Sequence, residues 1–197
     1  MSVKKHIVDT MKQLYNKKYI SIRDGNVSFK PKYENFFYIS AGGIKKNEIN
    51  EDQIIKVHFD QNLMLNYNKN KKYTPSREIY MHSLLQTDIE YFYKDTFVVH
   101  AHPPNIISYT GLNKSNQLST IKDIFPELNV GNIGKNVSYH EAGTMDLARE
   151  CYSNLIKNDI IALERHGSLS IGHDIEKVYE DIETLEYYIN ISLNSKH

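Results

Sequence analysis

His100 and His102 have the spacing that two side chains need to bind one metal ion. They follow an apolar, β-branched run at residues 97–99 that is typical of a buried strand. Residues i and i+2 of a strand point to the same face, about 7 Å apart along the chain, so the two imidazoles can close on one ion. Pro103 and Pro104 end the strand, and sites in α/β sheets form at such ends. The same pattern also suits two surface histidines.

His166 is the candidate third ligand. It follows the apolar run 160–163 and precedes Gly167, at a tight connection between two expected strands. A catalytic zinc ion takes three protein ligands and keeps one position open, so three neutral imidazoles would suit it. By itself, a His-Gly pair is more typical of a turn. His140, in an irregular stretch where sites often form, is a further histidine of interest.

Glu78 is the candidate acid–base group. It falls in the first turn of a helix expected from Pro75 to about Gln86. Acidic residues favour that turn because of the helix dipole, so a catalytic role requires that Glu78 lie close to the metal, where it can bind the ion or carry a proton. His82 lies four residues further along the same helix face, which indicates a Glu–His pair.

Several residues could bind an anion. Gly25 and Asn26, like Gly42 and Gly43, belong to expected turns where backbone N–H groups can converge. Ser76 and Arg77 begin the helix that carries Glu78; helix N-termini attract phosphate, and an arginine can bind phosphate or carboxylate through two parallel hydrogen bonds. Glycines also serve simply as turns, and the chain lacks the Gly-x-x-x-x-Gly-Lys phosphate loop.

Composition narrows the class of protein. At 197 residues the chain predicts one domain with a substantial core. Its 24 basic and 24 acidic residues give no signature of binding to nucleic acid or an anionic membrane, and Lys45 and Lys46 are interpreted as part of a solvated loop. The absence of a membrane-length apolar run, of a secretory signal and of a second cysteine beside Cys151 predicts a soluble cytoplasmic protein.

The expected elements alternate along the chain. Helices are predicted at 3–18, 75–86, 104–111, 144–157 and from 174 almost to the C-terminus, and strands at 27–30, 36–40, 54–59, 63–66, 97–102, 160–163 and 169–171. Strands that cluster with helices between and around them indicate a single mixed α/β layer structure.

Read in order, six segments of the chain resemble the class II aldolase/adducin family. They are Gly-Asn-Val-Ser at 25–28, Ile-Ser-Ala-Gly-Gly at 39–43, Pro-Ser-Arg-Glu at 75–78, His-Ala-His-Pro-Pro at 100–104, Gly-Thr-Met-Asp-Leu-Ala at 143–148 and Arg-His-Gly-Ser-Leu-Ser-Ile-Gly at 165–172. Each segment is unspecific alone. In this order, over nearly the whole chain, they are specific for the family and much less so for the reaction.

The resemblance implies one class II aldolase-like domain over residues 1–197, a three-layer α/β/α fold with a central, largely antiparallel sheet. It implies a zinc ion, or a similar divalent metal, on three histidines that match His100, His102 and His166. It also implies a cyclic homotetramer with active sites at the subunit interfaces.

In the family's sugar-phosphate aldolases, the glutamate that matches Glu78 binds the free metal and transfers the proton. Asn26, Gly43 and Ser76 match positions that bind the substrate phosphate. Arg77 stands where serine is common, so phosphate is expected and a carboxylate remains an alternative. Glu127 aligns with a position that the family fills with tyrosine, glutamate or aspartate, often reaching a neighbouring subunit; glutamate there marks a dehydratase branch.

The implied activity is a zinc-dependent lyase that cleaves a small phosphorylated ketose by a retro-aldol reaction through a metal-stabilised enediolate. Glu78 favours the aldolase, whereas Glu127 favours a dehydratase. A decarboxylase or an epimerase of a sugar phosphate remains open as well. A non-catalytic, adducin-like interaction module is the alternative from another class, but such a module should have lost the histidines and the glutamate.

Overall fold

A seven-stranded sheet organises the described part of the chain. The computed structural model describes residues 2–62, 64–69, 72–112 and 116–195. The strands are β1 (Asn26–Lys30), β2 (Phe36–Ser40), β3 (Ile54–Phe59), β4 (Leu65–Asn66), β5 (Thr96–Ala101), β6 (Ile160–Leu163) and β7 (Gly167–Gly172). Their order is β4-β3-β2-β1-β5-β7-β6, and the neighbouring strands pair antiparallel.

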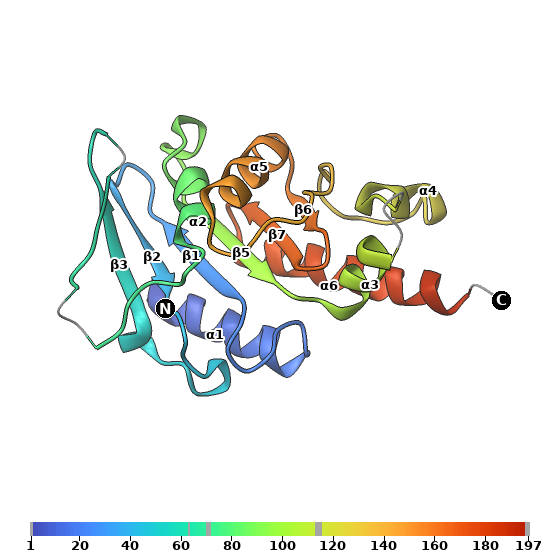
Figure 1. Cartoon of the computed structure of the whole chain (residues 1–197), viewed down its shortest axis with the longest axis horizontal. Helices are drawn as coiled ribbons and strands as arrows, with labels where there is room; N and C mark the ends of the chain where they lie inside the picture. Colours follow the sequence, from blue (N-terminus) through green and yellow to red (C-terminus); the bar gives the residue numbers. More distant parts are fainter. Residues whose placement is uncertain (1, 63, 70–71, 113–115, 196–197) are drawn as a thin grey trace.

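Helices form a layer on each face of the sheet (Figure 1). The α-helices are α1 (Val3–Asn16), α2 (Ile79–Gln86), α3 (Pro104–Leu112), α4 (Ile121–Ile124), α5 (Met145–Leu155) and α6 (Ile175–Asn194), and short 3-10 helices are η1 (Lys46–Glu48), η2 (Glu51–Gln53), η3 (Ile89–Tyr91) and η4 (Leu118–Thr120). Helices α1, α3 and α6 cover one face, and α2 and α5 cover the other. The predicted three-layer α/β/α fold with an antiparallel sheet is confirmed.

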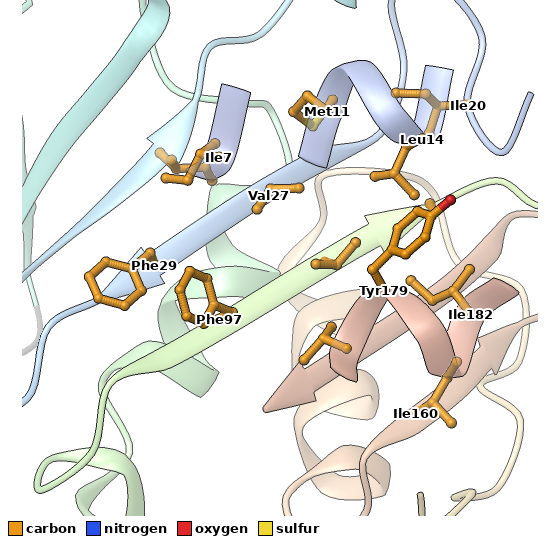
Figure 2. Close-up of a cluster of buried hydrophobic side chains, with 14 of the residues drawn as sticks. Ile7, Met11, Leu14, Ile20, Val27, Phe29, Phe97, Ile160, Tyr179 and Ile182 are labelled. Atoms are coloured by element: carbon orange, nitrogen blue, oxygen red, sulfur yellow. The ribbon is translucent and has the colours of Figure 1, made fainter. Parts of the chain in front are cut away.

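Alternation along β5 divides its side chains between two apolar clusters. Phe97 and Val99 join the larger cluster, in which the rings of Phe29 and Phe97 lie 4.5 Å apart beneath α1 and α6 (Figure 2). Val98 joins the smaller cluster under α2 and α5. Because side chains alternate, His100 points to the same face as Val98, toward α2. The candidate site therefore lies on the face that α2 covers.

The helix predicted at 75–86 begins later than expected. Helix α2 starts at Ile79, with Glu78 at its N-cap rather than inside its first turn. The preceding segment stays extended because it pairs with the chain after β2: Pro75 forms an antiparallel bridge with Ala41, and the Ser76 N–H donates to the Ser40 carbonyl at 3.2 Å. This tertiary pairing overrides the local helix signal.

Other boundaries differ by a few residues. Strand β5 ends at Ala101, one residue before His102, and the strand predicted at 169–171 extends over Gly167–Gly172. Leu63, the predicted first residue of the second hairpin strand, lies outside the described residues. Within the part of the chain that the structure describes, no helix is both long and apolar enough to cross a membrane.

Candidate metal and anion site

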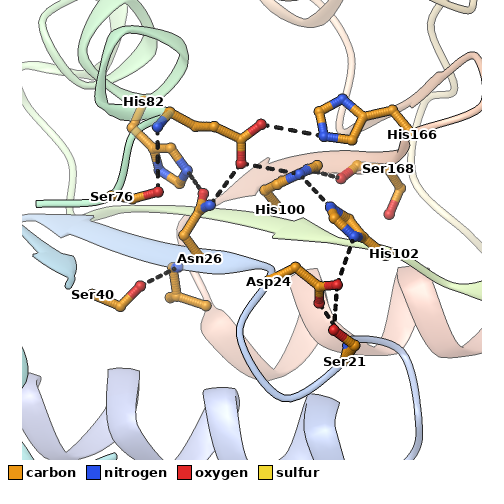
Figure 3. Close-up of polar contacts among 12 residues, drawn as sticks. Ser21, Asp24, Asn26, Ser40, Ser76, His82, His100, His102, His166 and Ser168 are labelled. Carbon is orange, nitrogen blue, oxygen red and sulfur yellow. Dashed lines mark hydrogen bonds and ion pairs between the residues drawn. The ribbon is translucent and has the colours of Figure 1, made fainter. Parts of the chain in front are cut away.

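Three histidines from two neighbouring segments meet at one point. His100 lies near the end of β5, His102 follows that strand, and His166 lies in the connection between β6 and β7 (Figure 3). Antiparallel pairing of β5 with β7 sets Ala101 opposite Ser168, which brings the connection beside the end of β5. One side-chain nitrogen of each histidine lies within 4.8 Å of the others.

The close approach of the two segments depends on Gly167. A Cβ atom at this position would lie 2.1 Å from the Ala101 carbonyl oxygen. Such a contact is far inside van der Waals distance, so any side chain here would push β7 away from β5 and His166 away from His100.

Two of the imidazoles are oriented by acceptors behind them. His100 is fully buried, and its Nδ1 donates to the Ser168 carbonyl at 2.9 Å. Asp24 Oδ2 lies 3.4 Å from His102 Nδ1, and the Asp24 carboxylate is itself held by the N–H and hydroxyl of Ser21, both at 2.6 Å. Since a carbonyl and a carboxylate can only accept, each imidazole in its neutral form carries its proton on Nδ1 and directs the lone pair of Nε2 toward the centre.

The centre is therefore a cluster of acceptors. The Nε2 atoms of His100 and His102 lie 2.9 Å apart. Glu78 adds its carboxylate: Oε2 lies 3.3 Å from His100 Nε2, and Oε1 lies 3.2 Å from His166 Nε2. Oε1 is buried and makes no hydrogen bond among the described residues. Lone pairs this close repel unless a cation lies between them, so the donor set fits a divalent metal ion.

The protonation states also suit a metal. Burial lowers the pKa of His100 to about 3, which keeps its imidazole neutral. Burial raises the pKa of Glu78, but the nearby imidazoles of His100 and His166 and a hydrogen bond from Asn26 outweigh burial and hold the pKa below its ordinary value. At neutral pH the cluster thus contains an ionised carboxylate and a neutral imidazole, the forms that bind metals.

A buried series of hydrogen bonds holds the Glu78 carboxylate in place. The Asn26 amide donates to Glu78 Oε2 at 2.8 Å, its oxygen accepts from His82 Nε2, and His82 Nδ1 lies 2.7 Å from the Ser28 hydroxyl. Gln86 donates to that hydroxyl at 2.8 Å. The expected Glu78–His82 pair is not formed, because Asn26 lies between the two side chains.

The four predicted anion-binding residues line one cleft with the metal cluster. This cleft of about 300 Å³ is bordered by Asn26, Gly43, Ser76, Arg77, Glu78, His102 and His166, among others. Gly43 has a φ of +67°, and a Cβ built there would meet nothing within 4 Å, so its backbone faces open space. A larger hollow of about 540 Å³, along α6 and residues 17–19, contains none of the candidate residues.

Sequence reasoning missed three charged residues that line the cleft, Arg23, Asp24 and Lys46. Lys46 was interpreted as solvated, yet it is only 1 % exposed and its ammonium donates to the Ala41 carbonyl at 3.0 Å. Asp24 directly precedes Gly25 and Asn26, and its place next to these candidate residues was the only feature of the sequence that could have identified it. Nothing local distinguishes Lys46 from Lys45, since only folding determines which of them faces the cleft.

Other candidates lie away from the cleft. Glu127 is exposed in the turn after α4 and does not line the cleft of this chain. His140 pairs with Glu150 instead of joining the cluster. Cys151 is fully buried in α5, and burial raises the pKa of its thiol, so it is a core residue rather than a nucleophile.

Comparisons with known proteins found related sequences. Residues 5–193 match the model of the family described as "Class II Aldolase and Adducin N-terminal domain". The chain is 30 % identical over 173 residues to an L-fuculose phosphate aldolase of Methanococcus maripaludis, covering 88 % of this chain and 86 % of that protein. It is 27 % identical over 193 residues to an L-fuculose phosphate aldolase of Methanocaldococcus jannaschii, covering 96 % and 95 %.

Solved structures share the fold. A structure of L-fuculose 1-phosphate aldolase has a TM-score of 0.75 at 22 % identity, over 98 % of this chain and 86 % of that one. A sugar-phosphate aldolase from Thermotoga maritima has a TM-score of 0.78 at 18 % identity, over 97 % and 93 %. At these identities the likeness shows the fold alone.

Proposed function

The chain belongs to the class II aldolase and adducin family, and on that premise we propose that it is a metal-dependent lyase that cleaves a small phosphorylated ketose by a retro-aldol reaction. One observation carries the proposal: the acceptor cluster of three histidines and Glu78 shares a cleft with Gly43, Ser76 and Arg77. The relatives named L-fuculose phosphate aldolase support a sugar phosphate as the substrate class.

His100, His102 and His166 would hold the metal, with zinc as the first choice and another divalent ion as the alternative. A bound divalent ion would supply Lewis acidity, polarising the substrate carbonyl and stabilising the negative charge that develops on oxygen. Three imidazoles leave a coordination position for the substrate.

Proton transfer falls to Glu78. In retro-aldol cleavage a hydroxyl proton is lost as the carbon–carbon bond breaks, and the carbon that keeps the electron pair must later gain a proton. Glu78 is ionised, directed toward the histidine cluster, and held at Oε2 by Asn26, so its carboxylate can accept and return a proton there. Ser76 and Arg77 directly precede Glu78 in the sequence and line the same cleft. An anion bound at these two residues would therefore lie close to the proton-transfer group.

Subunit assembly is part of the proposal. We expect a single domain over residues 1–197 and a cytoplasmic cyclic homotetramer with interfacial active sites, since closed rotational symmetry is the common outcome for homo-oligomers. Glu127 is exposed and lies outside the cleft of its own chain, as a residue that reaches a neighbouring subunit must. A monomer mass by light scattering at working concentration would contradict the assembly.

The reaction is tested by the mass of the products. The zinc-reconstituted protein is incubated with a panel of ketose 1-phosphates, and retro-aldol cleavage releases dihydroxyacetone phosphate and an aldehyde. A product lighter than the substrate by one water would instead indicate a dehydratase, which Glu127 favours. Loss of carbon dioxide from a keto-acid phosphate would indicate a decarboxylase, and an isomer of equal mass would indicate an epimerase. Reconstituted protein without a stoichiometric divalent metal, by elemental analysis, would refute the metal site.

A further inference from the structure

Lys46 is a buried cation without a carboxylate partner. It is the first residue of η1, three positions after Gly43, and is 1 % exposed. Its ammonium has three donor hydrogens, yet within the described ranges it has one acceptor, the Ala41 carbonyl at 3.0 Å, and no ion pair. A buried charge is costly unless it is paired and hydrogen-bonded, so two unused donors at the wall of a cleft point to a ligand.

The nearest carboxylates are already engaged. The negative charges of Asp24 and Glu78 favour the charged form of Lys46, but neither carboxylate forms an ion pair with it. Asp24 accepts from Ser21 and faces His102. Glu78 accepts from Asn26 and faces His100. Burial lowers the pKa of Lys46 to about 8, so the ammonium is predominantly charged at neutral pH.

Two other unused donors line the same cleft. The Gly43 N–H has no hydrogen-bond partner in the portion of the chain described, and neither has the Arg77 guanidinium. Together with Lys46 they form a set of donors from two segments, the turn at 43–46 and the stretch before α2 that contains Arg77. The third arginine or lysine of the cleft, Arg23, donates to the Gly43 carbonyl. A phosphate monoester, whose terminal oxygens accept several hydrogen bonds at once, suits such a set better than a planar carboxylate.

We infer that Lys46 is an anion-binding residue of this cleft, and that its ammonium binds the phosphate of the substrate together with the Gly43 amide and Arg77. The identity of the ligand as a phosphorylated sugar rests on the proposed function, whereas the anion site does not. The competing explanation is structural, since Lys46 also holds the Ala41 carbonyl and hence the turn that follows β2.

The neighbouring lysine offers a matched control. Lys45 is half exposed and forms an ion pair with Glu48 at 3.4 Å. Lys45→Gln and Lys46→Gln remove the same charge from adjacent positions, but only Lys46 lines the cleft. Lys46→Gln also keeps an amide donor for the Ala41 carbonyl, which preserves the turn and isolates the effect of the charge.

The test is a calorimetric titration of inorganic phosphate into the zinc-reconstituted wild type and both variants. We expect Lys46→Gln to weaken phosphate binding about 10- to 100-fold, the change that corresponds to loss of a hydrogen bond to a charged group, while Lys45→Gln binds as the wild type does. In the cleavage assay the same change should raise KM for the phosphorylated substrate and leave kcat nearly constant. Lys46→Arg should restore part of the affinity.

Unchanged phosphate affinity in Lys46→Gln, with or without a lower thermal midpoint, would overturn the inference and leave the proposed function standing. If phosphate binding depends on Lys46 but no phosphorylated ketose is cleaved, the inference about Lys46 stands and the proposed function is refuted. Should Lys46→Gln fail to fold, the ammonium ¹⁵N resonance of Lys46 in the wild type decides: it should shift on addition of phosphate, and a resonance that does not move refutes phosphate contact.

Discussion

The two ends of the cleft are built in different ways. At the metal end, His100 and His102 lie at the end of one strand, and register with β7 brings His166 beside them. At the anion end, Gly43 and Arg77 come from segments that are held together by backbone pairing, with a bridge between Pro75 and Ala41 and a hydrogen bond from the Ser76 N–H to the Ser40 carbonyl. The metal end thus depends on strand geometry, whereas the anion end depends on contacts between loops.

This difference separates the expected chemistry of the two ends. His100 is fully buried and Glu78 is 8 % exposed, so the metal end holds its groups in fixed positions, as a reacting centre requires. Arg77 is exposed, and an exposed side chain that grips a non-reacting phosphate binds ground state and transition state alike. Substitutions at the metal end should therefore lower kcat or metal content, and those at the anion end should raise KM.

The largest effect is expected from Glu78→Gln. The amide keeps the size of the side chain but cannot accept the proton, so kcat should fall ~10²–10⁴-fold while the zinc content measured by elemental analysis stays close to that of the wild type. Glu180→Gln is the control variant, since Glu180 is an exposed glutamate of α6 that does not line the cleft. Near-wild-type turnover of Glu78→Gln would assign proton transfer to another group, with Glu127 or His140 next to be tested.

Asp24→Asn probes the support of the metal end. Loss of the charge behind His102 Nδ1 should weaken zinc binding about 10- to 100-fold, as outer-shell substitutions at metal sites do, measured by competition with a chromogenic chelator. Asp9→Asn is the control, since Asp9 is an exposed carboxylate paired with Lys5 on α1. If zinc affinity is unchanged and only the thermal midpoint falls, Asp24 serves the Ser21 turn alone.

Arg77→Ala probes the anion end. If the anion is phosphate, KM should rise about tenfold or more with kcat and zinc content nearly unchanged, and inorganic phosphate should compete less well with the substrate. Arg149→Ala, at an exposed position of α5, should change neither constant. A fall in kcat instead of a rise in KM would indicate a carboxylate that takes part in the reaction, and would erase the distinction between the two ends.

Sequence reasoning succeeded where the chemistry is local. The spacing of His100 and His102 on one strand is enough to bring two imidazoles together. His166 was a candidate from its place between two expected strands, and the family resemblance favoured a ligand over a turn histidine. Helix α2 was placed too early because the local signal at Pro75 could not reveal its bridge to Ala41.

Residues whose role depends on distant segments were missed. Lys46 faces the cleft because the chain turns after β2, a fact that no spacing rule contains. His82 looked like the partner of Glu78 but hydrogen-bonds Asn26 and Ser28, which belong to β1. Glu127 and the homotetramer remain predictions, because they concern a second subunit.

His82 holds Asn26, the residue that hydrogen-bonds Glu78 at the metal end, and gives the smallest expected effect, which appears in stability. Its Nε2–H donates to Asn26 and its Nδ1 accepts from Ser28, so the buried ring must stay neutral. Burial lowers its pKa from 6.5 to about 4. Between these values the unfolded chain binds a proton that the folded chain does not, so the stability present above pH 6.5 is lost as the pH falls toward 4.

The loss should be at most about 1.4 kcal/mol per pH unit for this one group. Urea unfolding of wild type and His82→Gln at pH 7 and pH 5 measures it. The variant is expected to be less stable than the wild type at pH 7, because the substitution interrupts the series of hydrogen bonds that runs from Gln86 to Glu78. It should also lose less stability than the wild type when the pH is lowered to 5. His58→Gln, on the exposed side of β3, controls for removal of a surface histidine. Equal losses in wild type and His82→Gln would mean that the titration of His82 does not cause the loss of stability, and that other groups of the protein account for it.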